Sequence, residues 1–167
     1  MEELITALKE ILEAEANGGE LDGIIINDEE NVLPEAVETP NAQGQLPMMI
    51  TISEVQETFE VQESHYEVAV GEVDLAIITP VLKKEQNKWR SAKNRLKPVT
   101  KKLRKVIMSN QKLACTSYPN GIIYQPRNTK IESVVYGYSS IGSIWYCFAR
   151  CRLKTKYLYR NYQISLT

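Results

Sequence analysis

The chain has 167 residues, of which 43% are hydrophobic and 25% charged, as in a soluble globular protein of a single domain, residues 1–167. No apolar run approaches the roughly 20 residues of a membrane-spanning helix, and the acidic start MEELITALKE is unlike a signal peptide, so we expect a product of the cytoplasm that uses no membrane. Three cysteines are too few, and odd in number, for a disulfide framework.

The net charge of −1 hides a division of the chain into an acidic half and a basic half. Of the 21 acidic residues, 19 lie in residues 1–80, where Lys9 is the only Lys or Arg. Of the 20 Lys and Arg residues, 19 lie in residues 81–167, where Glu85 and Glu132 are the only acidic residues. The sequence therefore predicts a molecule with strongly charged surfaces of opposite sign.

The first predicted element is a helix over Glu2–Ala16. Its apolar residues recur with the period of a helix and form one stripe, made of Leu4, Ile5, Leu8, Ile11 and Leu12. The run Asn17-Gly18-Gly19 ends it, because glycine tolerates the left-handed conformation that often follows a helix.

A first group of strands is predicted next. We expect short strands at Gly23–Asn27 and Met49–Val55, and a further strand, or a continuation, at Thr58–Gln62. The polar stretch Asp28–Gln45, with two prolines, is expected to be a loop. Tyr66–Ile78 has the clearest alternation of apolar and polar residues, and its phase changes at Gly71, which predicts a bulge there.

The stretch from Val81 to Lys112 is basic and predicts a long helix over Lys84–Ser109. Apolar residues recur among its lysines and arginines at helical spacing. Pro98 interrupts this pattern, so either the helix is disturbed at Pro98 or it divides there into two shorter helices; we favour the first.

The remaining residues predict a second group of strands. Asn120-Gly121 between two β-prone runs predicts a hairpin, with strands at Leu113–Ser117 and Ile122–Gln125. Alternation predicts a strand at Ile131–Tyr138, and aromatic residues predict a closing strand or strand pair at Ile144–Leu153 and Lys156–Leu166. The fold class is therefore α+β: a largely antiparallel β-sheet packed against an N-terminal amphipathic helix and a long central basic helix.

No pattern in the chain indicates catalysis or a cofactor. Cys115, Cys147, Cys151 and His65 could form a zinc set, but their spacing fits no usual zinc motif, so we expect buried thiols instead. Glu72 and Asp74 with Lys83 or Lys84 resemble a nuclease metal site only faintly, because a further acidic ligand is missing. We expect a protein that is not an enzyme.

The basic stretch has two interpretations. It could bind nucleic acid through its cations, namely Lys83, Lys84, Lys88, Arg90, Lys93, Arg95, Lys97, Lys101, Lys102, Arg104 and Lys105. It could instead pair with the acidic half, within the subunit or between neighbouring copies, which we favour because an acidic half would repel DNA. Trp89 is the only aromatic residue among these charges, so a stacking platform for single strands is not indicated.

The layout of the chain resembles the tail terminator and tail-completion (neck) proteins of tailed bacteriophages. The resemblance rests on the helix Glu2–Ala16, the run Leu46-Pro47-Met48-Met49-Ile50-Thr51-Ile52, the strand Tyr66–Ile78, the long helix and the aromatic segment Trp145–Tyr162. It covers most of the chain but includes no diagnostic motif. The hairpin-rich segment Leu113–Tyr138 and the charge division depart from the family's pattern.

The resemblance implies a homo-oligomeric ring, usually of about six copies, at the head–tail junction of the virion. The ring would cap the tail tube, dock the head-side connector and let DNA pass without sequence-specific binding. We expect the basic helix to face a neighbouring subunit or ring, and the loops Asp28–Gln45 and Pro119–Thr129 to contact adjoining rings. The candidate interface residues are Lys83, Lys84, Lys88, Arg90, Lys97, Lys101, Lys102, Arg104, Lys105, Glu29, Glu30, Glu35, Pro119 and Asn120.

Overall fold

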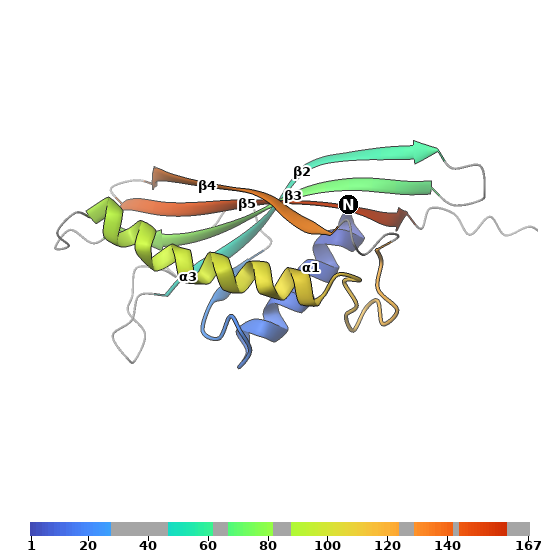
Figure 1. Ribbon diagram of the computed structural model, residues 1–167, viewed down its shortest axis with the longest axis horizontal. Coiled ribbons are helices and arrows are strands. Elements are labelled where there is room, and N and C mark those ends of the chain that lie inside the picture. Colours follow the sequence, from blue (N-terminus) through green and yellow to red (C-terminus); the bar gives the residue numbers. More distant parts are fainter. Residues whose placement is uncertain (28–46, 62–66, 82–87, 124–128, 142–143, 160–167) are drawn as a thin grey trace, which may run out of the picture.

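The structure is a computed structural model that describes residues 1–27, 47–61, 67–81, 88–123, 129–141 and 144–159. Within these residues the fold comprises two helices and a five-stranded sheet (Figure 1). The elements in chain order are α1 (Glu2–Ala16), β1 (Ile25–Asn27), β2 (Met49–Val61), β3 (Glu67–Pro80), α3 (Lys88–Ser109), β4 (Lys130–Ile141) and β5 (Ile144–Tyr159).

The strands lie in the order β1-β2-β3-β5-β4. The short β1 is parallel to β2, and every other neighbouring pair is antiparallel. The prediction of an α+β fold with a largely antiparallel sheet is therefore confirmed. The loop predicted at Asp28–Gln45 lies outside the described residues.

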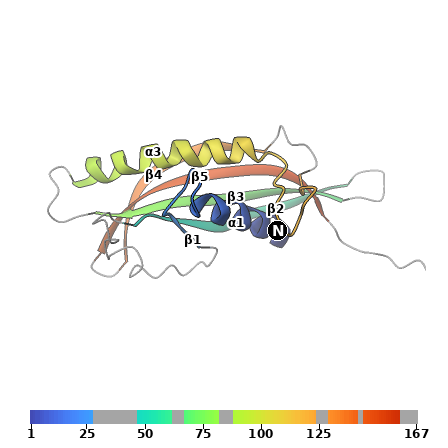
Figure 2. The ribbon, with the colours of Figure 1, turned by 90° about the horizontal axis from the view of Figure 1, so that it is seen from below.

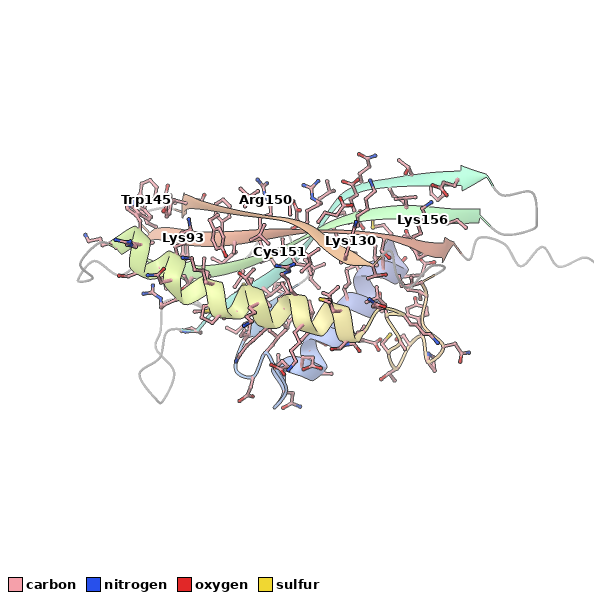
Figure 3. The ribbon with its side chains drawn as sticks, viewed as in Figure 1. Lys93, Lys130, Trp145, Arg150, Cys151 and Lys156 are labelled. Carbon is pink, nitrogen blue, oxygen red and sulfur yellow. The ribbon has the colours of Figure 1, made fainter. Side chains whose placement is uncertain are left out.

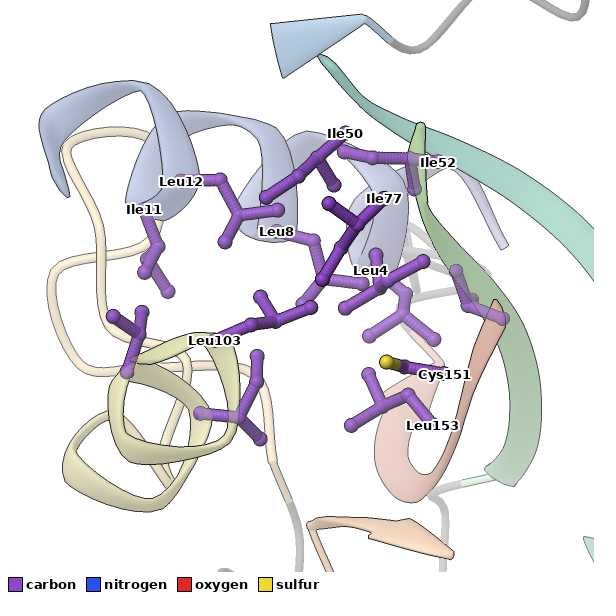
Figure 4. Close-up of a cluster of buried hydrophobic side chains, with 14 of the residues drawn as sticks. Leu4, Leu8, Ile11, Leu12, Ile50, Ile52, Ile77, Leu103, Cys151 and Leu153 are labelled. Atoms are coloured by element: carbon purple, nitrogen blue, oxygen red, sulfur yellow. The ribbon is translucent and has the colours of Figure 1, made fainter. Parts of the chain in front are cut away.

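Both helices cover the same face of the sheet (Figures 1 and 2), and among the described residues the other face carries no helix (Figure 1). The predicted stripe of α1 is confirmed, because Leu4, Leu8 and Leu12 are completely buried. They pack with Leu103 of α3 and with alternate residues of β2, β3 and β5, such as Ile77, in one core (Figure 4). The core is therefore one apolar layer. The helices contribute side chains to it about every 3.6 residues, and the strands contribute every second side chain.

β2 and β3 form a long antiparallel pair that extends beyond the helices (Figure 1). The predicted bulge at Gly71 is wrong, because the irregularity lies in the partner strand, between Glu54 and Gln56. Gly71 has another reason to be glycine: a Cβ there would lie 2.6 Å from Cδ2 of Leu4 and 3.0 Å from Cε1 of Tyr157. The first turn of α1 therefore packs directly on the backbone of β3.

α3 is one continuous helix that contains Pro98. Pro98 is exposed, so the carbonyl that loses its usual partner, four residues earlier, lies on the side facing solvent. The buried side is formed by Ala92, Leu96, Thr100, Leu103, Val106 and Ile107. Division into two helices at Pro98 is excluded, and residues 84–87 of the predicted helix lie outside the described part.

The hairpin predicted around Asn120-Gly121 is only partly present. The turn is confirmed, because the N–H of Gly121 donates to the carbonyl of Tyr118 at 2.8 Å and Gly121 has a φ of +76°. The strand predicted at Leu113–Ser117 is wrong. The backbone N–H and C=O groups of Cys115 and Tyr118 form hydrogen bonds with each other, so they do not pair with a neighbouring strand. Ile123 forms an isolated bridge to Tyr157, and residues 124 and 125 lie outside the described residues.

β4 and β5 complete the sheet. β4 extends the predicted strand Ile131–Tyr138 at both ends. β5 is one strand of 16 residues rather than a pair. It lies between β3 and β4 from Tyr146 to Lys154, which explains its apolar side chains there.

Candidate assembly interface

Cations gather on the side of α3 that faces away from the sheet. Lys105 forms an ion pair with Glu20, which lowers the pKa of that carboxyl. The other exposed cations form no ion pair with any residue that the structure describes; they are Lys88, Arg90, Lys97, Lys101, Lys102 and Arg104. Among the exposed cations of α3, Lys105 is thus the one that forms an ion pair with the acidic half within the described part.

A shallow hollow of about 390 Å³ lies on this basic side of α3. Lys101, Arg104 and Lys105 line it together with Met108, whose side chain is 64% exposed. Three of the nine predicted interface cations therefore line one hollow.

The other predicted interface residues are not brought onto this helix. Pro119 and Asn120 are exposed in the turn that ends at Gly121. Glu29, Glu30, Glu35, Lys83 and Lys84 lie outside the described residues.

The acidic and basic halves of the chain meet on the helix-free face of the sheet. Asp74 and Arg152 are direct cross-strand partners on β3 and β5. Nε and Nη2 of Arg152 donate to the two carboxylate oxygens of Asp74 at 2.5 and 3.1 Å, and Nη1 donates to Glu72 at 3.3 Å. Lys154 pairs with Glu72 at 3.0 Å, and Lys156 pairs with Glu60 of β2 at 2.8 Å. This ion-pair ladder joins three carboxylates of the acidic half, those of Glu60, Glu72 and Asp74, to three cations of the basic half inside the subunit.

The ion pairs of the ladder shift pKa values so that the charged form of each shifted group is favoured. The ammonium group of Lys154, and then the guanidinium of Arg152, hold the pKa of Glu72 below its usual value. Asp74, and then Glu72, raise the pKa of Arg152. The same contacts bear on a nuclease site, because a divalent metal between Glu72 and Asp74 would have to compete with Arg152 for the same oxygens.

The cysteines lie in or beside the core. Cys147 and Cys151 are buried on the face of β5 that packs against the helices, and Cys115 is half-buried. Burial raises the pKa of all three thiols, that of Cys151 to about 11. In the described residues no three His, Cys, Asp or Glu side chains are placed to hold a metal ion, and His65 lies outside them.

Both outer strands of the sheet have a free edge among the described residues. β1 pairs only with Met49–Thr51, and no other described strand pairs with the outer edge of β2. β4 is the last strand on the other side. Its segment from Ser133 to Ser140 contains no charged residue and no proline, and Val135 and Tyr138 are each 48% exposed.

Three aromatic side chains meet where α3 begins, and we refer to Trp89, Tyr138 and Trp145 as the aromatic corner. The ring centroid of Trp89 lies 4.3 Å from that of Tyr138 and 5.5 Å from that of Trp145. Close by, Lys93 lies over the ring of Tyr136 at 4.9 Å, and Figure 3 shows Lys93 and Trp145 at the same end of the molecule. Sequence reasoning missed this cluster, because its members come from three elements and no spacing relates them.

Comparison of the chain with protein-family models and with curated proteins gave no match. Within the described part of the chain, no helix has the length and apolar character needed to cross a membrane.

Proposed function

We propose that this chain is a structural protein whose copies join through the edges of their sheets into a closed ring. The observation that carries the proposal is the outer edge of β4. A free edge presents unpaired N–H and C=O groups to any other strand, and natural proteins block such edges with charges or proline. The segment from Ser133 to Ser140 has neither, although a bulge between Ile131 and Ser133 interrupts the strand before it.

The direction of the strands supports a head-to-tail contact. β2 and β4 run in opposite directions, because three successive antiparallel pairings separate them. If neighbouring copies are related by rotation, β4 of one copy beside β2 of the next continues the antiparallel pattern. Such a contact joins two different surfaces of the subunit, and repetition generates either a closed ring or an open filament.

Following the resemblance to tail terminator and neck proteins, we further propose that the ring belongs to the head–tail junction of a tailed phage. It would be made in the host cytoplasm and become part of the virion, with the tail tube protein and the head-side connector as partners. The helix-free face of the sheet suits a lumen through which DNA passes. Arg152, Lys154 and Lys156 are neutralised there by acidic partners, which weakens their attraction for phosphate.

Val135→Lys tests the contact between edges. Val135 is an exposed residue of β4, and a lysine on an edge strand opposes pairing by placing a solvated charge there. We expect the native protein to have the mass of a closed ring, about six subunits, in light scattering after gel filtration, and the variant to have the mass of a monomer.

Met108→Lys is the matched control, because it places the same charge at an exposed apolar residue of α3, away from both edges. It should leave the ring intact. Loss of the ring in Met108→Lys but not in Val135→Lys would instead assign the contact to the basic helix. A native dimer that no salt concentration converts to a larger species would contradict a head-to-tail ring.

The second candidate function is binding of nucleic acid by the basic helix, residues 83–105. It is favoured by the six exposed cations of α3 that form no ion pair with a described residue. This function predicts binding of duplex DNA by a monomer or dimer, with an affinity that falls steeply as salt is added. Lys101→Gln combined with Arg104→Gln should make that salt dependence shallower, by a slope of about two.

A further inference from the structure

The aromatic corner leaves a large part of each of its rings accessible. Trp89 is 38% exposed, Tyr138 48% and Trp145 51%. The only other aromatic residue among the exposed large hydrophobic side chains of the described part is Phe59, on β2. Exposed aromatic groups gathered in one place are unusual on a protein surface and indicate a binding site.

The surroundings of the corner are positively charged. Lys88 and Arg90 are exposed beside Trp89, and Lys93 follows one turn later. α3 contains no acidic residue, nor does β5, and the only acidic residue of β4, Glu132, lies near the opposite end of that strand. A ligand of this surface therefore has to supply negative charge as well as flat apolar groups.

We propose that the aromatic corner binds the unpaired bases of single-stranded nucleic acid. Bases stack on aromatic rings irrespective of sequence, while phosphates neutralise nearby lysine and arginine side chains. An apolar protein surface fits less well, because it would remove water from Lys88 and Arg90 without replacing their charge partners. In a duplex the bases are already stacked, so the corner selects single strands.

The ring geometry limits the size of the site. The plane of Trp89 is tilted by 57° from that of Tyr138 and by 83° from that of Trp145, so the rings do not form a continuous flat platform. The corner therefore accepts only one or two bases, and its affinity for a single strand should be modest and strongly dependent on salt.

The chain offers a direct readout of this site, because its two tryptophans are both in the corner. Tryptophan emission is recorded while oligothymidylate of about 16 nucleotides is added at low salt, and the same titration is made with an abasic oligonucleotide of equal length. We expect saturable quenching by oligothymidylate that is reversed by salt. The abasic strand carries the same phosphates without bases and should bind at least about five-fold more weakly.

Variants separate stacking from charge, with affinity measured by the anisotropy of a labelled oligonucleotide. Trp89→Ala should weaken binding by about 5-fold to 100-fold, and Trp89→Phe should restore most of it, because a ring is again present. Phe59→Ala is the matched control, since Phe59 is 50% exposed on β2 and should have no effect. Repeating the titration on Val135→Lys makes the result independent of ring formation.

Three results would overturn the proposal. The first is the absence of quenching at low salt. The second is equal affinity for the abasic and the thymidylate strand with no effect of Trp89→Ala, which would show attraction to phosphate alone. The third is emission that changes with protein concentration but not with oligonucleotide, which would make the corner a contact between copies of this chain.

Discussion

Replacement of Leu8 by alanine should lower the free energy of unfolding by about 3–4 kcal/mol. Leu8 is completely buried and lies at the centre of α1, among side chains of both layers (Figure 4). Removing its isobutyl group loses the transfer free energy of the buried atoms and leaves a cavity that a sheet on one side and α3 on the other cannot fill. Urea denaturation followed by circular dichroism, at one protein concentration, measures the loss as a lower transition midpoint.

Two controls on the same helix interpret this result. Leu8→Met keeps the volume and should cost less than about 1.5 kcal/mol. Glu13→Ala changes an exposed residue of α1 and should alter the free energy of unfolding by no more than about 0.5 kcal/mol. If Leu8→Ala were as mild as Glu13→Ala, α1 would not pack on the sheet as described.

Elements with a complete apolar period were predicted well from the sequence. Leu4, Leu8 and Leu12 repeat at four-residue intervals, and this periodicity, together with the stop at Asn17-Gly18-Gly19, predicted α1 with the observed bounds. The strand predicted at Tyr66–Ile78 corresponds to β3, Glu67–Pro80. Its alternation was clear because β3 lies in the middle of the sheet and has neighbours on both sides. Local pattern and tertiary packing agree in these elements.

Predictions that depended on local turn chemistry were less successful. Asn120-Gly121 does form a turn. It does not produce a hairpin, because the preceding residues Cys115 and Tyr118 form backbone hydrogen bonds with each other. Gly71 was interpreted as the site of a bulge, whereas its lack of a side chain makes room for Leu4, which lies far away in sequence. No single-sequence pattern distinguishes these two reasons for a glycine.

The candidate surfaces show the same contrast. The cations of β5 alternate with apolar residues from Arg150 to Lys156, a period of two that could have predicted a charged face opposite Glu72 and Asp74. The partner of each cation depends on strand order and register, which the sequence did not supply. The aromatic corner is harder still, because Trp89 is distant in sequence from Tyr138 and Trp145 and meets them only when α3 packs at the end of β4 and β5.

Asp74→Asn should lower the free energy of unfolding by about 2 kcal/mol. The carboxylate of Asp74 is 11% exposed and accepts two hydrogen bonds from Arg152, so its loss leaves a guanidinium whose main partner is gone. Breaking a fully buried pair costs roughly 3–5 kcal/mol, but Arg152 is 32% exposed and keeps Glu72 at 3.3 Å, which reduces the effect. Urea denaturation at pH 7 measures the difference.

Glu60→Gln is the matched control, because it breaks the more exposed pair with Lys156 on the same face and should cost less than about 1 kcal/mol. A double-mutant cycle with Arg152→Leu then isolates the coupling, since the cost of Asp74→Asn should largely disappear when the guanidinium is already absent. Equal costs for Asp74→Asn and Glu60→Gln would show that burial adds nothing to the Asp74–Arg152 pair.

The ion-pair ladder should also make the free energy of unfolding depend on pH in the acidic range. Lys154 and Arg152 lower the pKa of Glu72 in the folded protein, so the folded state binds fewer protons than the unfolded chain between the two pKa values. The stability from Glu72 is therefore present above its unfolded pKa, near 4.5, and is lost as pH falls through the folded pKa. Glu72→Gln removes this contribution, so its free energy of unfolding should fall less steeply than that of the native protein from pH 5 to about pH 3. If the two profiles stayed parallel over that range, the ion pairs of Glu72 would not persist in solution, and the ladder would reduce to the Asp74–Arg152 pair.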